Sequence, residues 1–504
     1  MRIVVCNRLT EYLGVEILSA LLKAAGHSVE LVFEADLLSA TFLGALPPSL
    51  SQRADSAGRA ARRVLALEPD LVLFPSEVNS FAWCARVGSH IKTQNPQIVL
   101  LHGGFHVTSN PEDCIKSSGV DMLCIGEGDL AVPELVEVLD QGGDPRSIAN
   151  IWVKERDGTV HRNAPRPLVA DLDSLPWPDK SLYYDQLPGL SREYMCVASR
   201  GCHWACSFCF YTTLYDLYER DGFLRTRSPE HVIGELEAAR ERYDIECVVF
   251  HDDIFPTSIR WLREFAPLYK ERIGLPFSCI THPQLMTEET AELLADMGCR
   301  YTIMGAQTVN ESSRRPEGIN RTEDSEDIAR AIRRLKSRGV FVLVDHIFGI
   351  PGETLEDQED ALAFYVASGP DVVKPFFLTY FAGTDLTRRS HADQTVPADA
   401  LKRTESGDWD HFMFEGQLSG DDFRAYSLAY SVFPLLSQQG RERMLRWHLH
   451  HRLSALGRIP GLGKATFLPR LATGVLRDED IRPRLYLNYL KTLVTYQVKQ
   501  HLRS

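Results

Sequence analysis

Short apolar runs alternate with longer segments of helical periodicity over the first 145 residues of the chain. Buried strands are predicted at residues 3–5, 29–33, 71–74, 98–101 and 122–125. Strands that alternate with helices in this way predict an α/β domain built on a doubly wound parallel sheet. Such sheets bind their ligands at the carboxyl ends of the strands, where small and polar residues gather in this sequence.

A second alternation of strands and helices begins at residue 194. Its six strands are predicted at residues 194–198, 247–250, 277–280, 301–304, 341–344 and 372–377. Five prolines between residues 165 and 188 break the pattern ahead of it. We therefore predict a domain at 1–145, a linker at 146–193, a second domain at 194–385 and a mainly helical region at 386–504.

Composition and charge exclude several classes of protein. The net charge of −13 argues against a nucleic-acid partner that depends on attraction to phosphates. Most of the 11 cysteines lie in apolar stretches, which suits a reducing compartment better than a disulfide framework. The sequence shows no signal peptide and no apolar run of about 18 residues, so we expect a cytoplasmic protein without a membrane span.

Three cysteines, Cys202, Cys206 and Cys209, are spaced Cys-x3-Cys-x2-Cys. Thiolates at this spacing can hold one [4Fe-4S] cluster and leave its fourth iron open as a binding site. A zinc site would need a second Cys or His pair, but the next cysteine, Cys247, falls in a predicted strand. Zinc and a chance cluster of buried cysteines remain the alternatives.

The cysteine motif, with the aromatic Phe208 before its last cysteine, resembles the signature of the radical S-adenosylmethionine (SAM) enzymes. The resemblance implies a central partial (β/α)6 barrel and SAM bound at the open iron. It also implies that one electron, from a donor such as flavodoxin or ferredoxin, converts SAM to a 5′-deoxyadenosyl radical. Barrel enzymes carry their chemistry at the carboxyl ends of the strands.

Three of these strand ends carry further motifs. Asp252 and Asp253 follow the second strand and can accept hydrogen bonds from an ammonium group, although a solvated turn would look alike. The resemblance places this pair at the methionyl amino group of SAM, and Gln307 near the ribose and carboxylate. It places Gly349 and Gly352 at the adenine, where Glu353 and Thr354 are also expected to cap the next helix.

The N-terminal half resembles the Rossmann-like cobalamin-binding domain that precedes many radical SAM barrels. The resemblance rests on residues 12–16, 103–108 and 126–128, where glycines let the backbone approach a bulky cofactor. The residues that it assigns to cobalamin are Gly14, Ser76, Gly103, Gly104, His106, Gly126 and Glu127. The motif Asp-x-His-x-x-Gly is absent, which implies cobalt without that lower histidine. A Rossmann-like domain that has lost its ligand, or binds part of the substrate, is the alternative.

The C-terminal region carries a histidine group and several aromatic residues. Only one pair among His448, His450 and His451 has the (i, i+3) spacing of one helix side, so a solvated helix face is favoured over a metal site. Trp409 and Phe412 suit a cover over a large apolar substrate, or ordinary packing.

The resemblance covers about three quarters of the chain and predicts a cobalamin-dependent radical SAM enzyme that acts on a small molecule. The leading reaction is methyl transfer to an unactivated carbon or phosphorus centre. The first alternative keeps both cofactors but closes a ring, as in the anaerobic porphyrin-ester cyclases. The second is a cobalamin-dependent sensor, for which the sequence offers no output module.

Overall fold

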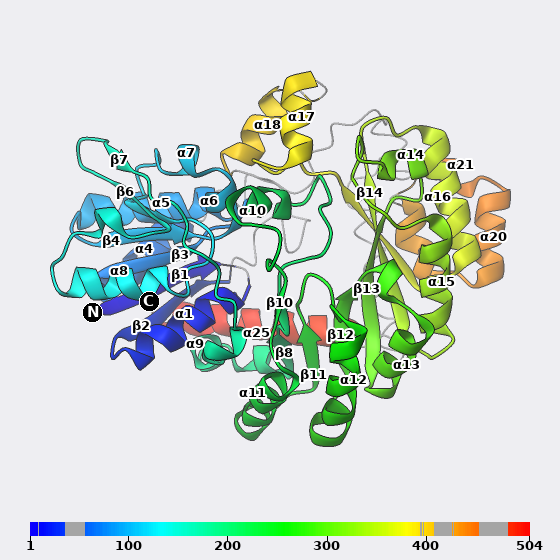
Figure 1. Cartoon of the computed structure of the whole chain (residues 1–504), viewed down its shortest axis with the longest axis horizontal. Coiled ribbons are helices and arrows are strands. Elements are labelled where there is room, and N and C mark those ends of the chain that lie inside the picture. Colours follow the sequence, from blue (N-terminus) through cyan, green and yellow to red (C-terminus); the bar gives the residue numbers. More distant parts are fainter. Residues whose placement is uncertain are drawn as a thin grey trace.

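The computed structural model describes residues 1–8, 10–35, 56–393, 396, 398–407, 426, 428–452 and 482–503. Trp409 and Phe412 lie outside these ranges. Two parallel sheets, each flanked by helices, stand side by side, and the C-terminal helix passes beneath both of them (Figure 1). No helix of the described residues is long and apolar enough to cross a membrane.

The N-terminal sheet has the strand order β2-β1-β3-β4-β5-β6-β7. Its strands are β1 (Arg2–Arg8), β2 (Ser28–Glu34), β3 (Leu71–Pro75), β4 (Val99–Gly103), β5 (Met122–Cys124), β6 (Ile151–Lys154) and β7 (Val160–His161). The connecting helices are α1 (Leu13–Ala24), α4 (Ser56–Ala66), α5 (Phe81–Gln94), α6 (Phe105–Ser109), α7 (Pro111–Cys114) and α8 (Ala131–Asp140). Apolar residues cover both faces, because Val4 and Phe74 pack under α4 and α5 while Val5 and Leu73 join the main core.

Residues 146–193 contain more regular structure than a linker. β6 pairs antiparallel with β5, and β7 pairs antiparallel with β6, so both strands extend the N-terminal sheet. The prolines that argued against regular structure all follow β7, and the short strands escaped notice because their apolar alternation is brief. Ile151 and Val153, two residues apart, are both buried against the core.

The second sheet is the predicted partial barrel, with six parallel strands in the order β15-β14-β13-β12-β11-β8. Its strands are β8 (Glu193–Cys196), β11 (Cys247–Phe250), β12 (Phe277–Thr281), β13 (Cys299–Gln307), β14 (Phe341–Phe348) and β15 (Val372–Phe377). The main outer helices are α11 (Pro229–Arg242), α12 (Ile259–Leu268), α13 (Glu288–Asp296), α15 (Ser325–Lys336) and α16 (Leu355–Ser368). A short ribbon, β9 (Ser199–Arg200) with β10 (Arg225–Thr226), leads into the cysteine loop, which ends at α10 (Tyr211–Leu217).

The C-terminal region is helical where it is described, with α17 (Asp385–Asp393), α18 (Ala398–Glu405), α20 (Gln438–Arg446), α21 (Leu449–Arg452) and α25 (Arg482–Arg503). The last of these helices joins the two sheets. Asn488 of α25 donates to the Gly189 carbonyl ahead of the barrel, at 2.8 Å. Tyr496 of α25 donates to the Phe33 carbonyl of β2, at 3.1 Å.

Candidate functional site

The cysteine loop is held from both sides by the barrel. Tyr215 of α10 donates from its hydroxyl to the carbonyls of Cys202 at 2.7 Å and Trp204 at 3.1 Å. On the other side, the backbone N–H and the hydroxyl of Ser207 donate to the carbonyls of Ile319 and Gly318, at 3.0 and 2.7 Å. The loop therefore has a fixed backbone rather than depending on a ligand for its shape.

The turn into this loop requires glycine. Gly201 has a φ of +101°, and a Cβ at this position would lie only 2.6 Å from the Phe223 carbonyl oxygen. A left-handed backbone with so close a neighbour accepts no side chain. Gly201 thus sets the direction in which the three cysteines leave the β9–β10 ribbon.

The three thiols are set in surroundings that suit a metal cluster. Burial raises the pKa of Cys202 to about 11 and raises those of Cys206 and Cys209, and charge on Cys206 adds to the rise at both of the other thiols. The guanidinium of Arg321 lies 3.8 Å from Cys206 Sγ. Thiolates crowded in this way need cations to stabilise them, which iron ions supply, so the residues fit a [4Fe-4S] cluster.

The adjacent carboxylates Asp252 and Asp253 have different surroundings. Asp252 is buried and accepts hydrogen bonds from the backbone N–H of Ala198, at 3.0 Å, and from the hydroxyl of Ser199, at 2.5 Å. Burial raises its pKa to about 7 although these bonds oppose the rise. Asp253 is exposed at the strand end and accepts from the Tyr211 hydroxyl beside the cysteine loop. Of the two, Asp253 is the one placed to meet a ligand.

Gln307 ends β13 in a strained conformation, with a φ of +63°. Non-glycine residues adopt this left-handed region rarely, at a cost of about 1–3 kcal/mol, and such strain gathers at functional sites. Arg321 donates to the carbonyl of the neighbouring Gly305 at 2.6 Å, so the guanidinium beside Cys206 also reaches this strand end.

The turn after β14 is closed by its own residues. Gly349 and Gly352 have φ values of +79° and +85°, and the Gly349 N–H donates to the Glu353 carboxyl at 2.7 Å. Burial raises the pKa of Glu353 to about 8. Thr354 is the N-cap of α16 and forms a capping box with Asp357, so Glu353 closes the turn while Thr354 caps the helix. Phe208 packs between this turn and the cysteine loop, against an apolar cluster that includes Ile347 and Ile350.

At the carboxyl edge of the N-terminal sheet, the loops after β3 and β4 touch. Ser76 is buried, its N–H donates to the Gly103 carbonyl at 2.6 Å, and its hydroxyl lies 3.0 Å from His102 Nδ1. Gly104 has a φ of +113°, and its Cβ would lie 2.9 Å from the Ser76 carbonyl oxygen. A Cβ on Gly103 would meet Cys124 at an ordinary 3.5 Å. The need for glycine at Gly104 thus comes from neighbouring backbone.

The other residues assigned to cobalamin have mixed surroundings. Gly14 is exposed on α1, and a Cβ there would meet nothing within 4 Å. His106 is buried against Phe81, with ring centroids 5.1 Å apart. A Cβ on Gly126 would collide with the hydroxyl of Tyr218, which comes from α10's end in the second domain.

Glu127 bonds to the barrel. Its carboxylate accepts from both terminal nitrogens of Arg225 on β10, at 2.9 and 2.6 Å. Arg200 on β9 bonds to the nearby Asp129, at 2.7 and 3.0 Å. These ion pairs fix the loop after β5 against the ribbon that carries the cysteine loop, and the cobalamin roles of Gly126 and Glu127 stay predictions.

The glycine loop and the cysteine loop meet directly. Phe105, which follows Gly104 and is 42% exposed, packs its ring on Phe210, which follows Cys209, with centroids 3.7 Å apart. The turn after β15 joins them, since a Cβ on Gly383 would lie 2.7 Å from the Ser109 carbonyl oxygen of α6. At this edge Asn7 Oδ1 is buried without a partner among the described residues, which suits a cofactor rich in amide groups. The edge, with exposed Phe105 and open space at Gly14, fits a large planar cofactor facing the cluster.

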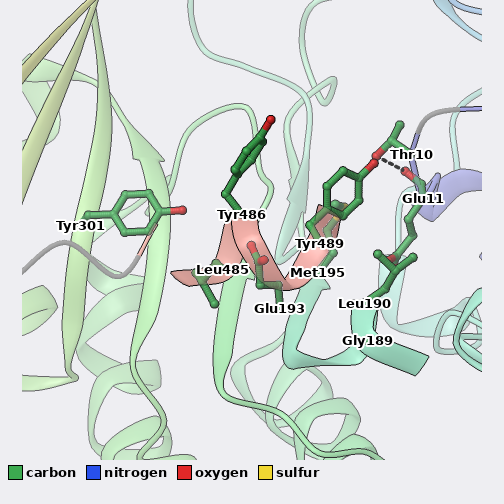
Figure 2. Close-up of a pocket in the computed structure, with 10 residues that line it drawn as sticks. All are labelled: Thr10, Glu11, Gly189, Leu190, Glu193, Met195, Tyr301, Leu485, Tyr486 and Tyr489. Carbon is green, nitrogen blue, oxygen red and sulfur yellow. Dashed lines mark hydrogen bonds between the residues drawn. The ribbon is translucent and has the colours of Figure 1, made fainter. Parts of the chain in front are cut away.

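A cavity of about 250 Å³ lies lower in the molecule, between the barrel and α25 (Figure 2). Glu193 and Met195 line it from β8, and Tyr301 faces them from β13. Tyr486 and Tyr489 cover it from α25, as the close-up shows. Burial raises the pKa of Glu193 to about 7, with the charge of Glu246 adding to the rise. Sequence reasoning missed this cavity, because α25 follows Tyr301 by some 180 residues.

Sequence reasoning also missed Arg321. Its side chain contacts the Cys206 thiol, the Gly305 carbonyl and the Glu323 carboxylate, and so links two of the predicted ligand positions. The residue follows β13 in a loop without a recognisable motif. Its importance appears only when the barrel brings this loop behind the cysteine loop.

Comparisons with known proteins agree with this arrangement. The B12 binding domain family matches residues 7–136, and the radical SAM superfamily matches residues 196–365. The chain therefore belongs to the radical SAM enzymes that carry a B12-binding domain. Its cofactors are a [4Fe-4S] cluster, SAM and cobalamin.

Individual relatives are distant. The chain is 26% identical to an uncharacterised methyltransferase of Pyrococcus horikoshii, over 65% of this chain and 70% of that protein. It is 25% identical to the anaerobic magnesium-protoporphyrin IX monomethyl ester cyclase of Rubrivivax gelatinosus, over 73% of this chain and 64% of that protein. Among solved structures, the radical SAM methyltransferase TsrM of Kitasatospora setae, with cobalamin and a [4Fe-4S] cluster bound, shares the fold with a TM-score of 0.62 and 17% identity. That match covers 90% of this chain and 99% of TsrM.

Proposed function

We propose that this enzyme transfers a methyl group to an unactivated carbon or phosphorus centre of a small-molecule substrate. The observation that carries the proposal is the contact between Phe105 and Phe210, which brings the glycine loop and the cysteine loop together. When bound, the cluster and SAM supply hydrogen abstraction, and cobalamin supplies a methyl group. Two such cofactors in adjoining loops can act on one substrate without moving far.

The chain's own residues would bind and orient SAM. Cys202, Cys206 and Cys209 would hold the cluster, and Asp253 would accept from the methionyl ammonium group. Gln307, which can both donate and accept, would bind the ribose or carboxylate. The turn formed by Gly349 and Gly352 would lie by the adenine, with Phe208 packed beneath it.

On the cobalamin side, we propose contacts from Gly14, Ser76, Gly103, Gly104 and His106, at the edge that faces the cysteine loop. Gly126 and Glu127 would act through their contacts with Tyr218 and Arg225, by fixing the two domains against each other. An electron donor of the flavodoxin or ferredoxin kind would supply the reducing equivalent.

The barrel cavity beneath the cluster would hold the more apolar part of the substrate. Three tyrosines and Met195 line it, so that it offers ring faces and hydroxyl groups to a bulky, mostly apolar body. Glu193 would bind a hydrogen-bond donor of that body. This arrangement fits a natural product or similar small molecule better than a peptide chain.

Ring closure is the second candidate, because the likeness to the cyclase covers 73% of this chain. The two reactions differ in their use of SAM. Methyl transfer should form one S-adenosylhomocysteine and one 5′-deoxyadenosine per product, and the label of methyl-labelled SAM should enter the product. Cyclisation should form 5′-deoxyadenosine without matching S-adenosylhomocysteine. A variant with alanine at all three cluster cysteines should form neither product of SAM during turnover.

A further inference from the structure

Four potential metal-binding side chains converge on the outer side of the barrel. They are Glu359 from α16 and His448, His450 and His451 from the segment that joins α20 to α21. Each side chain offers one ligand atom, and the four atoms lie within 4.8 Å of one another. Figure 1 shows α16, α20 and α21 together at the side of the barrel that faces away from the N-terminal sheet.

The group is partly enclosed. His450 is fully buried, and its Nε2 lies 2.9 Å from Glu359 Oε1. His451 Nε2 contacts the same carboxylate oxygen, and the rings of His450 and His451 lie 4.3 Å apart. His450 Nδ1 is buried with no hydrogen-bond partner among the described residues. An expected solvated helix face would show none of these features.

The backbone explains how three closely spaced histidines face one point. On a regular helix, only His448 and His451 would share a side. In the structure α21 begins at Leu449, and His448 lies outside it with a φ of +46°. This left-handed residue turns the chain, so that His450 and His451 both reach Glu359. The backbone strain, about 1–3 kcal/mol, needs an interaction that offsets it.

We propose that Glu359, His448, His450 and His451 form a binding site for a zinc-type divalent metal ion, separate from the cluster and from cobalamin. Imidazole nitrogen and carboxylate oxygen are zinc ligands, and four of them complete a tetrahedral site. Bonds of 2.0–2.1 Å place tetrahedral ligands about 3.4 Å apart. The spread of at most 4.8 Å is therefore closed by small side-chain rotations.

The site would act as a clamp between two parts of the chain that are distant in sequence. Glu359 belongs to α16, whose first turn carries the Thr354 cap and follows Gly352. The histidines belong to the C-terminal region. A metal ion bound by both would hold that region against the barrel, and exposed His448 gives the ion a path of entry.

The test uses the full-length protein with its [4Fe-4S] cluster loaded, so that iron occupies the three cluster cysteines. After treatment with a mild chelator and removal of metal, zinc is titrated by calorimetry and counted by mass spectrometry. We expect one zinc per chain and a rise in melting temperature. H448A and H451A, at the more exposed positions, should lower the zinc affinity at least about 100-fold and abolish that rise.

H391A is the matched control, since His391 also pairs with a carboxylate, Glu405, but has no further histidine beside it among the described residues. It should bind zinc as the wild type does. E359Q should lose zinc while iron content and 5′-deoxyadenosine formation persist, which separates this site from the proposed reaction. Absence of zinc binding by the wild type, or equal affinity in the wild type and H448A and H451A, would overturn the assignment.

Discussion

Asp252 and Asp253 show how two identical neighbouring side chains take different roles. Both were candidates for the amino group of SAM. Asp252 uses its carboxylate to hold the backbone at Ala198 and Ser199, where the chain leaves β8 for the cysteine loop. Asp253 points to Tyr211 and stays accessible. One residue positions the loop, and the other is available to the cofactor.

The pair can be separated by substitution. D252A removes the acceptor of buried donors and should lower the retained iron by at least half, because the loop loses its anchor. D253A should keep its iron but weaken SAM binding about tenfold or more. Iron assays and equilibrium SAM binding, both under anaerobic conditions, measure these effects. Loss of iron in D253A together with full iron in D252A would reverse the roles.

Glu193 in the barrel cavity predicts a pH-dependent stability. Its pKa is raised by burial to about 7, from an ordinary value of 4.5, so the folded protein binds this proton more tightly than the unfolded chain. Stability from this group is present below about pH 4.5 and is lost as the pH rises to about 7. E193Q should therefore unfold at a higher temperature than the wild type at pH 8, with the difference vanishing near pH 5.

The size of that effect is on the order of 2–3 kcal/mol, since one pKa unit corresponds to about 1.4 kcal/mol. Glu241, an exposed residue of α11, provides the control. E241Q should leave the melting temperature within error at both pH values. A wild type and E193Q that melt together at pH 8 would show that the Glu193 carboxylate is not destabilised by its surroundings.

At the scale of secondary-structure elements, the glycines of the N-terminal sheet differ in what they do. Gly104 is required by the contact between the β3 and β4 loops, because its Cβ would lie 2.9 Å from Ser76. Gly14 has free space around it at the start of α1. A substitution at Gly104 therefore tests the fold, whereas one at Gly14 tests the cofactor.

We expect G104A to lower the stability of the cobalamin-free protein by about 1–3 kcal/mol through backbone strain and close contact. G14V should leave the cobalamin-free protein folded, because no atom lies within 4 Å of the added Cβ. It should retain less cobalamin after gel filtration, measured by absorbance. Full cobalamin retention by G14V would remove Gly14 from the predicted site.

The elements that could be predicted from sequence were those with strong local signals. All five parallel strands of the first sheet and all six of the barrel coincide with apolar runs bounded by turn residues. The ribbon β6–β7 is too short to give such a signal. The cysteine loop, fixed by local spacing, was also visible. Arg321, the cavity under α25 and the convergence on Glu359 arise from tertiary contacts that no local pattern encodes.

At the scale of the whole molecule, a buried ion cluster joins the segment after the N-terminal sheet to α1. Lys180 Nζ lies 2.6 Å from Glu11 and 2.8 Å from Glu16, and all three side chains are at most 5% exposed. Removing one partner of a buried ion pair leaves uncompensated charge, which costs about 3–5 kcal/mol. This cluster should therefore contribute strongly to the cohesion of the two domains.

K180A should lower the free energy of unfolding by that amount, measured in denaturant. The matched control is K23A, because Lys23 pairs with Asp179 near the surface with 39% of its side chain exposed. Surface pairs contribute about 1 kcal/mol or less, so K23A should change stability little. Equal effects of the two substitutions would contradict the assigned role of the buried cluster.

The central claim is that the facing loops hold a methyl donor and a radical source for one reaction. The most direct measurement requires no substrate. Holoenzyme carrying its cluster and reduced cobalamin is mixed with methyl-labelled SAM, and label and S-adenosylhomocysteine are counted. The proposed function predicts that about one label per chain moves to protein-bound cobalamin, with an equal amount of S-adenosylhomocysteine. Cobalamin that stays unlabelled while 5′-deoxyadenosine accumulates would contradict methyl transfer and favour the cyclase reaction.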